Sequence, residues 1–245
     1  MYETIASPID YGGIRLKNRI IFAPTTLGLK GEAYREKIRQ IAAGGCAMII
    51  LGDVPVTKHG FGQSLFTAKG FAAYRELTDL IHAENCLACA QLHQSDSNVK
   101  AMLKYVPGVL SKKISMEDLR PLLNQEVSPY ICGLSTRKIK QITDSFGRAA
   151  VQSRKAGFDM VQIHGDRMCG SFASPVFNHR TDEYGGPLKT ASALPWKRSK
   201  RSGFRPRICR LILSWPCVRK IRTTAMPVCW PRNCPWWCLR WSGPV

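Results

Sequence analysis

Acidic residues are missing from the last part of the chain. Residues 189–245 contain thirteen Lys or Arg and no Asp or Glu, so all 17 acids of the 245-residue chain lie before them. The net charge of +19 would by itself suggest nucleic acid or an anionic membrane surface as a partner. Residues 1–188, with 23 bases and 17 acids, carry only +6 and have an ordinary globular composition.

Long apolar runs and clustered histidines are also lacking. The longest clear apolar run, Cys46 to Leu51, is far below the roughly 18 residues that can span a bilayer, so no membrane partner is expected. The opening MYETIASPIDYGG has an acidic residue and no apolar core, which excludes a signal peptide and makes a reducing, cytoplasmic location the expectation. His59, His82 and His179 show no metal-ligand spacing, so no metal site is expected.

Residues 1–188 do contain an alternation of buried strands and amphipathic helices. Short apolar runs stopped by Gly or Pro predict strands, and apolar residues at helical spacing predict helices. Strands are expected at 18–24, 46–51, 86–92 and 159–164, and helices at 32–43, 71–85 and 136–156. Continuously apolar strands that alternate with helices pair in parallel with both faces covered. The prediction is an α/β fold of the (β/α)8 TIM barrel class, with about four units recognisable.

The ends of these strands carry the functional information, because active sites of such barrels lie at the carboxyl ends of the strands. The residues there are Ala23-Pro24-Thr25-Thr26, Gly52-Asp53, Gln91-Leu92-His93 and His164-Gly165. The connection 93–134 is long for this fold, and long connections are usually functional. We expect it to form part of a lid or a wall of the site.

Several sequence strings at these strand ends resemble those of one enzyme family. They are NRIIFAPTT at 18–26, ACAQL at 88–92, AGFDMVQIHG at 156–165 and RTDEYGG at 180–186, preceded by YGGIRLKNR at 11–19. Together and in this order they resemble the Old Yellow Enzyme family, the NADH:flavin oxidoreductases. The resemblance covers residues 1–188 and implies the first half of an FMN-dependent ene-reductase barrel, with NAD(P)H as the reductant.

The resemblance implies that Pro24, Thr25, Gly52 and Gln91 line the isoalloxazine ring of FMN. Gln91 can donate to and accept from the pyrimidine edge of a flavin. The small residues Thr25 and Gly52 would let the flat ring approach the backbone. Without the resemblance, Gln91 would be interpreted as a hydrogen-bonded structural residue at a strand end.

The resemblance also implies the catalytic candidates. His164 matches the first residue of the family's His-x-x-His/Asn pair, which hydrogen-bonds the carbonyl oxygen of an unsaturated substrate and stabilises the enolate-like charge as hydride arrives. The sequence departs from the family at the partner position, which is Arg167, and at the expected tyrosine proton donor, which is Cys169. Arg167 could supply the second hydrogen bond and Cys169 the proton. The alternative is a surface arginine and an inert buried thiol. Residues 180–186 are expected to be structural.

Residues 189–245 break the alternation and are interpreted as a separate region, with 1–188 as the barrel domain. The basic and aromatic residues suit a nucleic-acid arm. A second interpretation is a zinc module, for which thiolates could come from Cys229, Cys234 and Cys238, but these cysteines form no C-x-x-C pair. A third interpretation, which we favour, is that this region is translated in a shifted reading frame. Codons can be chosen so that the neighbouring frame of 189–203 reads NRLRFAVEAVKAVR, which resembles the continuation of the family's sequence. Similar choices for 222–241 give a balanced, helix-like sequence.

The frameshift interpretation has consequences for function. The phosphate site of such barrels is built from the loops after strands seven and eight, so FMN retention should be weak or absent. The fourth strand should have an unpaired edge, which favours aggregation. Two functions are therefore expected: an FMN-dependent ene-reductase that acts on a small unsaturated carbonyl compound, or a non-catalytic fragment whose basic tail binds nucleic acid nonspecifically. No specific nucleic-acid partner is expected.

Overall fold

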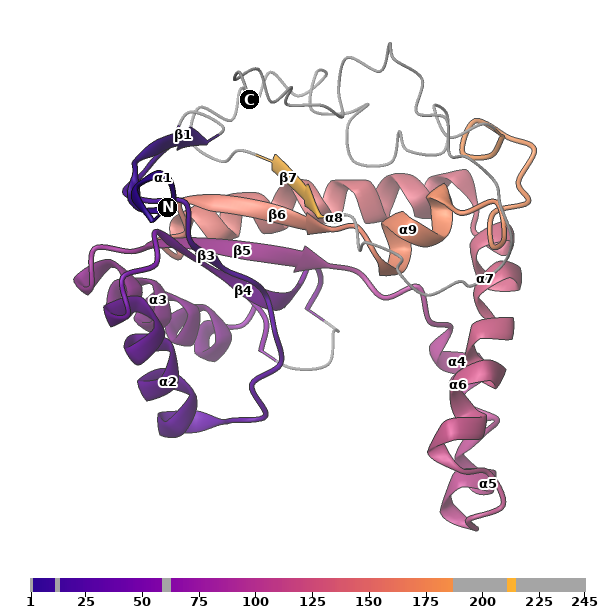
Figure 1. The fold of residues 1–245 in the computed structure, drawn as a ribbon. Coiled ribbons are helices and arrows are strands. Elements are labelled where there is room, and N and C mark those ends of the chain that lie inside the picture. The colour runs from indigo at the N-terminus through magenta and orange to yellow at the C-terminus, as the bar shows by residue number, and fades with distance from the viewer. Residues whose placement is uncertain (1, 12–13, 59–62, 187–210, 215–245) are drawn as a thin grey trace.

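The strands expected from the sequence form one parallel sheet (Figure 1). The computed structural model describes residues 2–11, 14–58, 63–186 and 211–214. Within them, a five-stranded sheet has the order β3-β4-β5-β6-β7, and every neighbouring pair is parallel. Its strands are β3 Ile21–Phe22, β4 Met48–Pro55, β5 Leu87–His93, β6 Met160–His164 and β7 Leu211–Ser214. The four predicted strands are confirmed, although β3 is shorter than expected.

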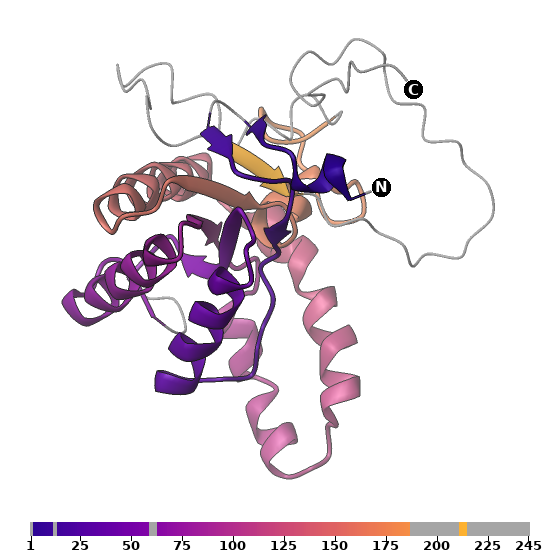
Figure 2. The same cartoon turned by 60° about the vertical axis from the view of Figure 1, so that its left-hand side comes forward.

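Three long helices follow the first strands and cover the outer face of the sheet (Figures 1 and 2). They are α2 Gly31–Ala43, α3 Ala68–Ala83 and α8 Thr136–Lys155. Local sequence explains their ends: the backbone N–H of Lys138 donates to the Ser135 hydroxyl at 3.2 Å, and Gly45, with φ +91°, follows the end of α2. A hydroxyl cap supplies a partner to an otherwise unpaired N–H, and glycine adopts the left-handed conformation without strain. The predicted helices are confirmed.

The inner face of the sheet packs on an N-terminal hairpin. Helix α1 Glu3–Ala6 precedes β1 Ile9–Tyr11, which pairs antiparallel with β2 Ile14–Leu16. Leu16 is buried with Met48, Ile50, Cys89 and Met160 in a core cluster on the inner face. The hairpin strands were not predicted from the sequence, because each has only three residues.

The long connection after β5 forms a helical arm that projects from the sheet (Figures 1 and 2). It contains α4 Val99–Leu103, α5 Val106–Leu110, α6 Met116–Gln125 and α7 Val127–Gly133. Helix α6 starts with a capping box, in which Ser115 and Asp118 each accept a backbone N–H of the other. Helix α9 Arg167–Ala173 follows β6. The role of the arm as a lid or wall stays a prediction.

One expectation about the tail is wrong. The edge of β6 is paired, because Val161 to His164 align in parallel with Leu211 to Ser214. The apolar LILS segment supplies backbone donors and acceptors that satisfy this edge. The remainder of 189–245, including the zinc-ligand candidates, lies outside the described residues. The nucleic-acid arm and the shifted reading frame therefore stay predictions. Among the described residues, no helix is long and apolar enough to cross a membrane.

Candidate active site

The inner face of the sheet becomes polar toward the carboxyl ends of its strands. Cys89 of β5 is in register with Met160 of β6, and two residues further on Gln91 is in register with Gln162. Side chains alternate between faces along a strand, so residues two apart point to the same side. Gln91 and Gln162 therefore form a polar layer directly above the apolar one, at the end where the sequence predicts the site.

Gly52 lies so close to the polar layer and to Pro24 that this position has no room for a side chain. The Nε2 of Gln91 donates to Oε1 of Gln162 at 2.8 Å, and both side chains are buried. A Cβ atom on Gly52 would lie 3.0 Å from Oε1 of Gln91 and 2.9 Å from Cβ of Pro24. Since real Cβ atoms almost never approach another atom below 3.0 Å, any larger residue at position 52 would displace its neighbours.

These residues fit the ring of a flavin. Gln91 uses one N–H on Gln162, which leaves its carbonyl oxygen and a second N–H for the alternating donors and acceptors of a pyrimidine edge. The structure thus brings together three of the predicted cofactor-binding residues, Pro24, Gly52 and Gln91. Thr25 follows Pro24 in the chain and is exposed. Gln162 was not identified from the sequence. Its position two residues before His164 in the same strand could have indicated that both side chains point to the same face.

The predicted catalytic histidine lies at the end of β6 with a defined tautomer. The backbone N–H of Asp166 donates to Nδ1 of His164 at 3.2 Å. A ring nitrogen that accepts a hydrogen bond carries no proton, so neutral His164 carries its proton on Nε2. His164 therefore presents an N–H donor, as the contact with a substrate carbonyl requires.

Two further groups lie beside His164 that the sequence placed at strand ends but did not assign to the site. The ring of His93 meets that of His164 edge-on with centroids 5.6 Å apart. Oδ1 of Asp53 lies 3.7 Å from Nε2 of His164. Burial lowers the pKa of His93, an effect that the nearby Asp53 carboxylate partly offsets. The pKa of His93 is therefore below its usual value, and the side chains of His93, Asp53 and His164 form one cluster.

The other two catalytic candidates lie on α9. Arg167 begins the helix, is exposed and has φ +40°, a conformation uncommon for residues other than glycine. Cys169 is partly buried and packs against the outer-face core. Burial raises the pKa of the Cys169 thiol to about 12. The thiol therefore keeps its proton at neutral pH.

Helix α9 is tied to the loop that follows β5. The Ser171 hydroxyl donates to Oδ2 of Asp96 at 2.6 Å, and both side chains are buried. The backbone N–H of Met168 donates to the carbonyl oxygen of Gln94 at 3.3 Å. These bonds hold the first turns of α9, and with them Arg167, against the end of β5.

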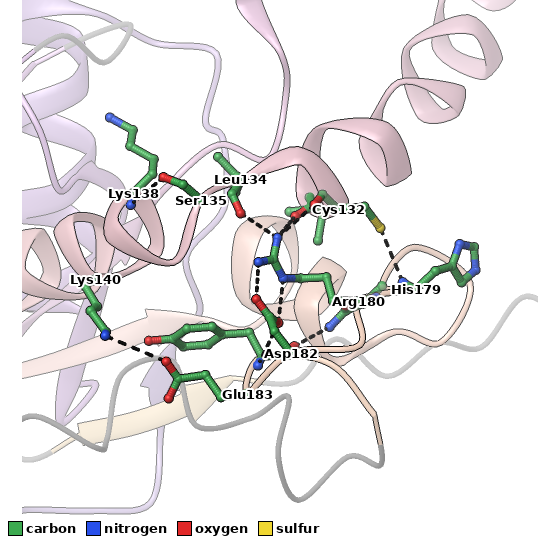
Figure 3. A network of polar contacts seen from close by, with 12 residues as sticks. Cys132, Leu134, Ser135, Lys138, Lys140, His179, Arg180, Asp182 and Glu183 are labelled. Atoms are coloured by element: carbon green, nitrogen blue, oxygen red, sulfur yellow. Dashed lines mark hydrogen bonds and ion pairs between the residues drawn. The ribbon is translucent and has the colours of Figure 1, made fainter.

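The RTDEYGG segment acts as a structural clamp (Figure 3). Nη1 of Arg180 donates to the carbonyl oxygens of Ile131 at 2.9 Å, Cys132 at 2.9 Å and Leu134 at 2.6 Å. The guanidinium also pairs with Asp182, with Nε to Oδ1 at 3.0 Å. Arg180 thus supplies partners to carbonyls at the C-terminal end of α7, which otherwise lack them. The expected structural role of this segment agrees with these contacts.

Known proteins resemble this chain over its first three quarters. It is 58% identical over 186 residues to the bilirubin reductase of Clostridium symbiosum (strain WAL-14163), which covers 76% of this chain and 50% of that protein. It is 33% identical over 192 residues to the bilirubin reductase of Mediterraneibacter gnavus (strain CC55_001C), covering 76% of this chain and 29% of that protein. The chain therefore spans half or less of the length of these two relatives.

The fold and the family agree. The crystal structure of Old Yellow Enzyme from Pichia sp. AKU4542 matches with a TM-score of 0.61 and 22% identity, over 78% of this chain and 54% of that one. This likeness confirms the TIM barrel class and the Old Yellow Enzyme fold. The sequence model of the NADH:flavin oxidoreductase / NADH oxidase family, whose cofactor is FMN and whose reductant is a nicotinamide nucleotide, matches residues 4–193. The chain therefore belongs to the NADH:flavin oxidoreductase / NADH oxidase family.

Proposed function

We propose that this chain carries the flavin-ring and substrate-carbonyl sites of an FMN-dependent reductase that reduces a C=C bond conjugated with a carbonyl group. The observation that carries the proposal is that polar groups suited to a flavin ring and a donor suited to a substrate carbonyl lie at the same end of the sheet. Gln91 offers free polar groups beside Gly52, which has no side chain, and His164 offers an N–H donor at the end of the neighbouring strand β6. When bound there, FMN supplies the hydride for the reduction.

His164 would act on the substrate carbonyl. Its Nε2–H donates to the oxygen, and this hydrogen bond strengthens as negative charge develops on that oxygen during hydride addition. The bond from the Asp166 N–H to Nδ1 holds the tautomer and the ring orientation, so the donor needs no rearrangement during the reaction. His164 therefore stabilises the enolate-like state more than the ground state.

Arg167 and Cys169 complete the proposal. The exposed guanidinium at the start of α9 is the candidate for the second hydrogen bond, and its fixed charge would stabilise the same oxygen. Cys169 is the candidate proton donor for the α-carbon, since its thiol stays protonated at neutral pH. Its high pKa makes it a weaker acid than a typical tyrosine, whose pKa is about 10, so we expect protonation to be slow.

The proposed substrate class follows from the relatives. The two bilirubin reductases described above are 58% and 33% identical to this chain. Bilirubin contains lactam carbonyls conjugated with C=C bonds, which is the chemistry that a His164 donor would activate. We propose bilirubin or a related linear tetrapyrrole as the substrate, and the cytoplasm as the location, consistent with the free cysteines among the described residues.

Binding of bilirubin and turnover test the proposal separately. Bilirubin in a chiral site acquires circular dichroism, so the purified chain should induce a signal that saturates with protein concentration. With excess FMN and NAD(P)H under nitrogen, bilirubin absorbance should fall faster than with the free cofactors. His164→Ala should lose both effects. The matched control is His82→Ala, because His82 pairs with Asp159 on the other side of the sheet. A chain that induces no dichroism and adds nothing to the free cofactors would refute the proposal.

A further inference from the structure

Asp53 reaches the site because the β4 ladder is interrupted. The pairing of β4 with β5 runs regularly to Leu51, shifts register, and resumes at Val54. Gly52 and Asp53 lie in this irregularity and are exposed. A register shift re-aims side chains and recurs beside active sites. Here it brings the carboxylate of a strand that is not adjacent to β6 to within 3.7 Å of Nε2 of His164.

Asp53 and His164 are an acceptor and a donor that do not satisfy one another. Nε2 of His164 carries the proton, since Nδ1 accepts from the Asp166 N–H. The 3.7 Å separation from Oδ1 of Asp53 is longer than a hydrogen bond. Among the residues that the structure describes, no donor lies within hydrogen-bond distance of the Asp53 carboxylate. The Nε2–H of His164 can therefore donate to a ligand, and the Asp53 carboxylate can accept from one.

The pair matches a particular functional group. A lactam presents a carbonyl oxygen and an N–H on adjacent atoms and on the same side, because its ring holds the amide cis. His164 can donate to the oxygen while Asp53 accepts from the N–H. A simple enone or an unsaturated ester offers only the oxygen and makes no hydrogen bond to the Asp53 carboxylate, so it gains less from this site.

We infer that Asp53 is a specificity-determining residue that accepts the N–H next to the activated carbonyl, so that this site selects α,β-unsaturated lactams over enones and esters. This inference rests on the proposed function, in which His164 binds the carbonyl. It assigns Asp53 a contact with the substrate and gives a chemical reason for a preference for tetrapyrrole-type compounds.

The test compares three small ligands that differ at one ring position, which carries N–H, N–CH3 or O. They are 1,5-dihydropyrrol-2-one, its N-methyl derivative and furan-2(5H)-one, titrated into the whole chain with excess FMN and followed by ligand-observed NMR. A hydrogen bond to a charged acceptor predicts that the N–H lactam binds roughly tenfold tighter than the other two. Asp53→Ala should abolish this preference, so that the three ligands bind with similar affinity. Asp53→Asn, whose amide oxygen can still accept, should keep part of it.

The controls separate the two proposals. Asp79→Ala removes another exposed carboxylate, on α3, and should keep the wild-type preference. Circular dichroism spectra of all variants should match the wild type. Equal affinity of the wild type for all three ligands would overturn the role of Asp53 and leave the carbonyl site standing. If none of the three ligands binds, or if His164→Ala binds them as well as the wild type, the proposed function itself fails, and the inference fails with it.

Discussion

The two ends of the parallel sheet differ in how their polar groups are satisfied. At the amino end, Oδ2 of Asp159 accepts the N–H of Ala88 at 2.8 Å and lies 2.8 Å from Nε2 of His82. The buried Thr78 hydroxyl donates to the carbonyl oxygen of Ala156 at 2.6 Å. Each of these side chains joins neighbouring segments of the fold, so this end is built for stability.

At the carboxyl end, polar groups face one another without closing all their bonds. Gln91 has spare donor and acceptor capacity beside Gly52, and Asp53 stands just beyond hydrogen-bond distance of His164. Such groups are available to bond a ligand. The same β/α units therefore have a structural end, where polar side chains join neighbouring segments, and a binding end, where polar groups stay available to a ligand.

The largest expected effect is on the clamp that supports the loops of the binding end. Arg180→Ala removes three bonds to carbonyls and the pair with Asp182 from a side chain that is 7% exposed. We expect the free energy of unfolding to fall by about 3 kcal/mol, measured by urea denaturation. Arg15→Ala is the matched control, because its pair with Asp10 is exposed and should be worth less than about 1 kcal/mol. Equal losses would show that Arg180 is not a clamp.

A pair of identical changes tests the contrast between the ends. Asp159→Ala leaves the N–H of Ala88 without its partner and should lower the free energy of unfolding by roughly 1–3 kcal/mol. Asp53→Ala removes a carboxylate that bonds no described residue and should change it by less than about 0.5 kcal/mol. Urea titrations of both variants give the answer. A larger loss for Asp53→Ala would reverse our assignment of the two ends.

Two glycine substitutions test the close packing around Gly52. Gly52→Ala places a Cβ 2.9 Å from Pro24 and 3.0 Å from Gln91 and should weaken flavin affinity by roughly tenfold. Gly147→Ala, on the exposed side of α8 with no atom within 4 Å of the added Cβ, should leave flavin affinity unchanged and stabilise the helix by about 1 kcal/mol. Fluorescence titration and thermal melting measure the two effects. Flavin binding that is insensitive to Gly52→Ala would place the ring elsewhere.

The smallest expected effect concerns the thiol of Cys169. Burial raises its pKa to about 12, so at pH 8 almost none of it is thiolate, the form that reacts. Alkylation by iodoacetamide, mapped by mass spectrometry, should be far slower at Cys169 than at a cysteine in a short peptide, and should increase as the pH rises. Rapid labelling at pH 8 in the folded protein would contradict an enclosed, protonated thiol.

Local patterns were sufficient to predict much of the fold. Apolar runs predicted β4, β5 and β6, and apolar residues at helical spacing predicted α2, α3 and α8, because both patterns depend on neighbours in the sequence. The N-terminal hairpin and β7 were not predicted. Their short strands are stabilised by pairing and packing with other segments, which leaves little local signal.

The site was only partly predictable for a similar reason. Pro24, Gly52, Gln91 and His164 could be named from strings at strand ends. Gln162, His93 and Asp53 acquire their positions from strand register and from the irregularity in β4, which depend on pairing between distant segments. The roles of Thr25, Arg167 and Cys169 stay predictions.

The most direct test of the flavin site is to compare FMN with riboflavin. The described strands contact a flavin ring in our account, whereas the phosphate loops of such barrels follow strands seven and eight. In fluorescence titrations the chain should bind both flavins saturably and weakly, with affinities within about threefold of each other, and Gln91→Ala should weaken both. Absence of saturable binding of either flavin, or flavin binding that Gln91→Ala leaves unchanged, would contradict the assignment of the carboxyl end of the sheet as the flavin site.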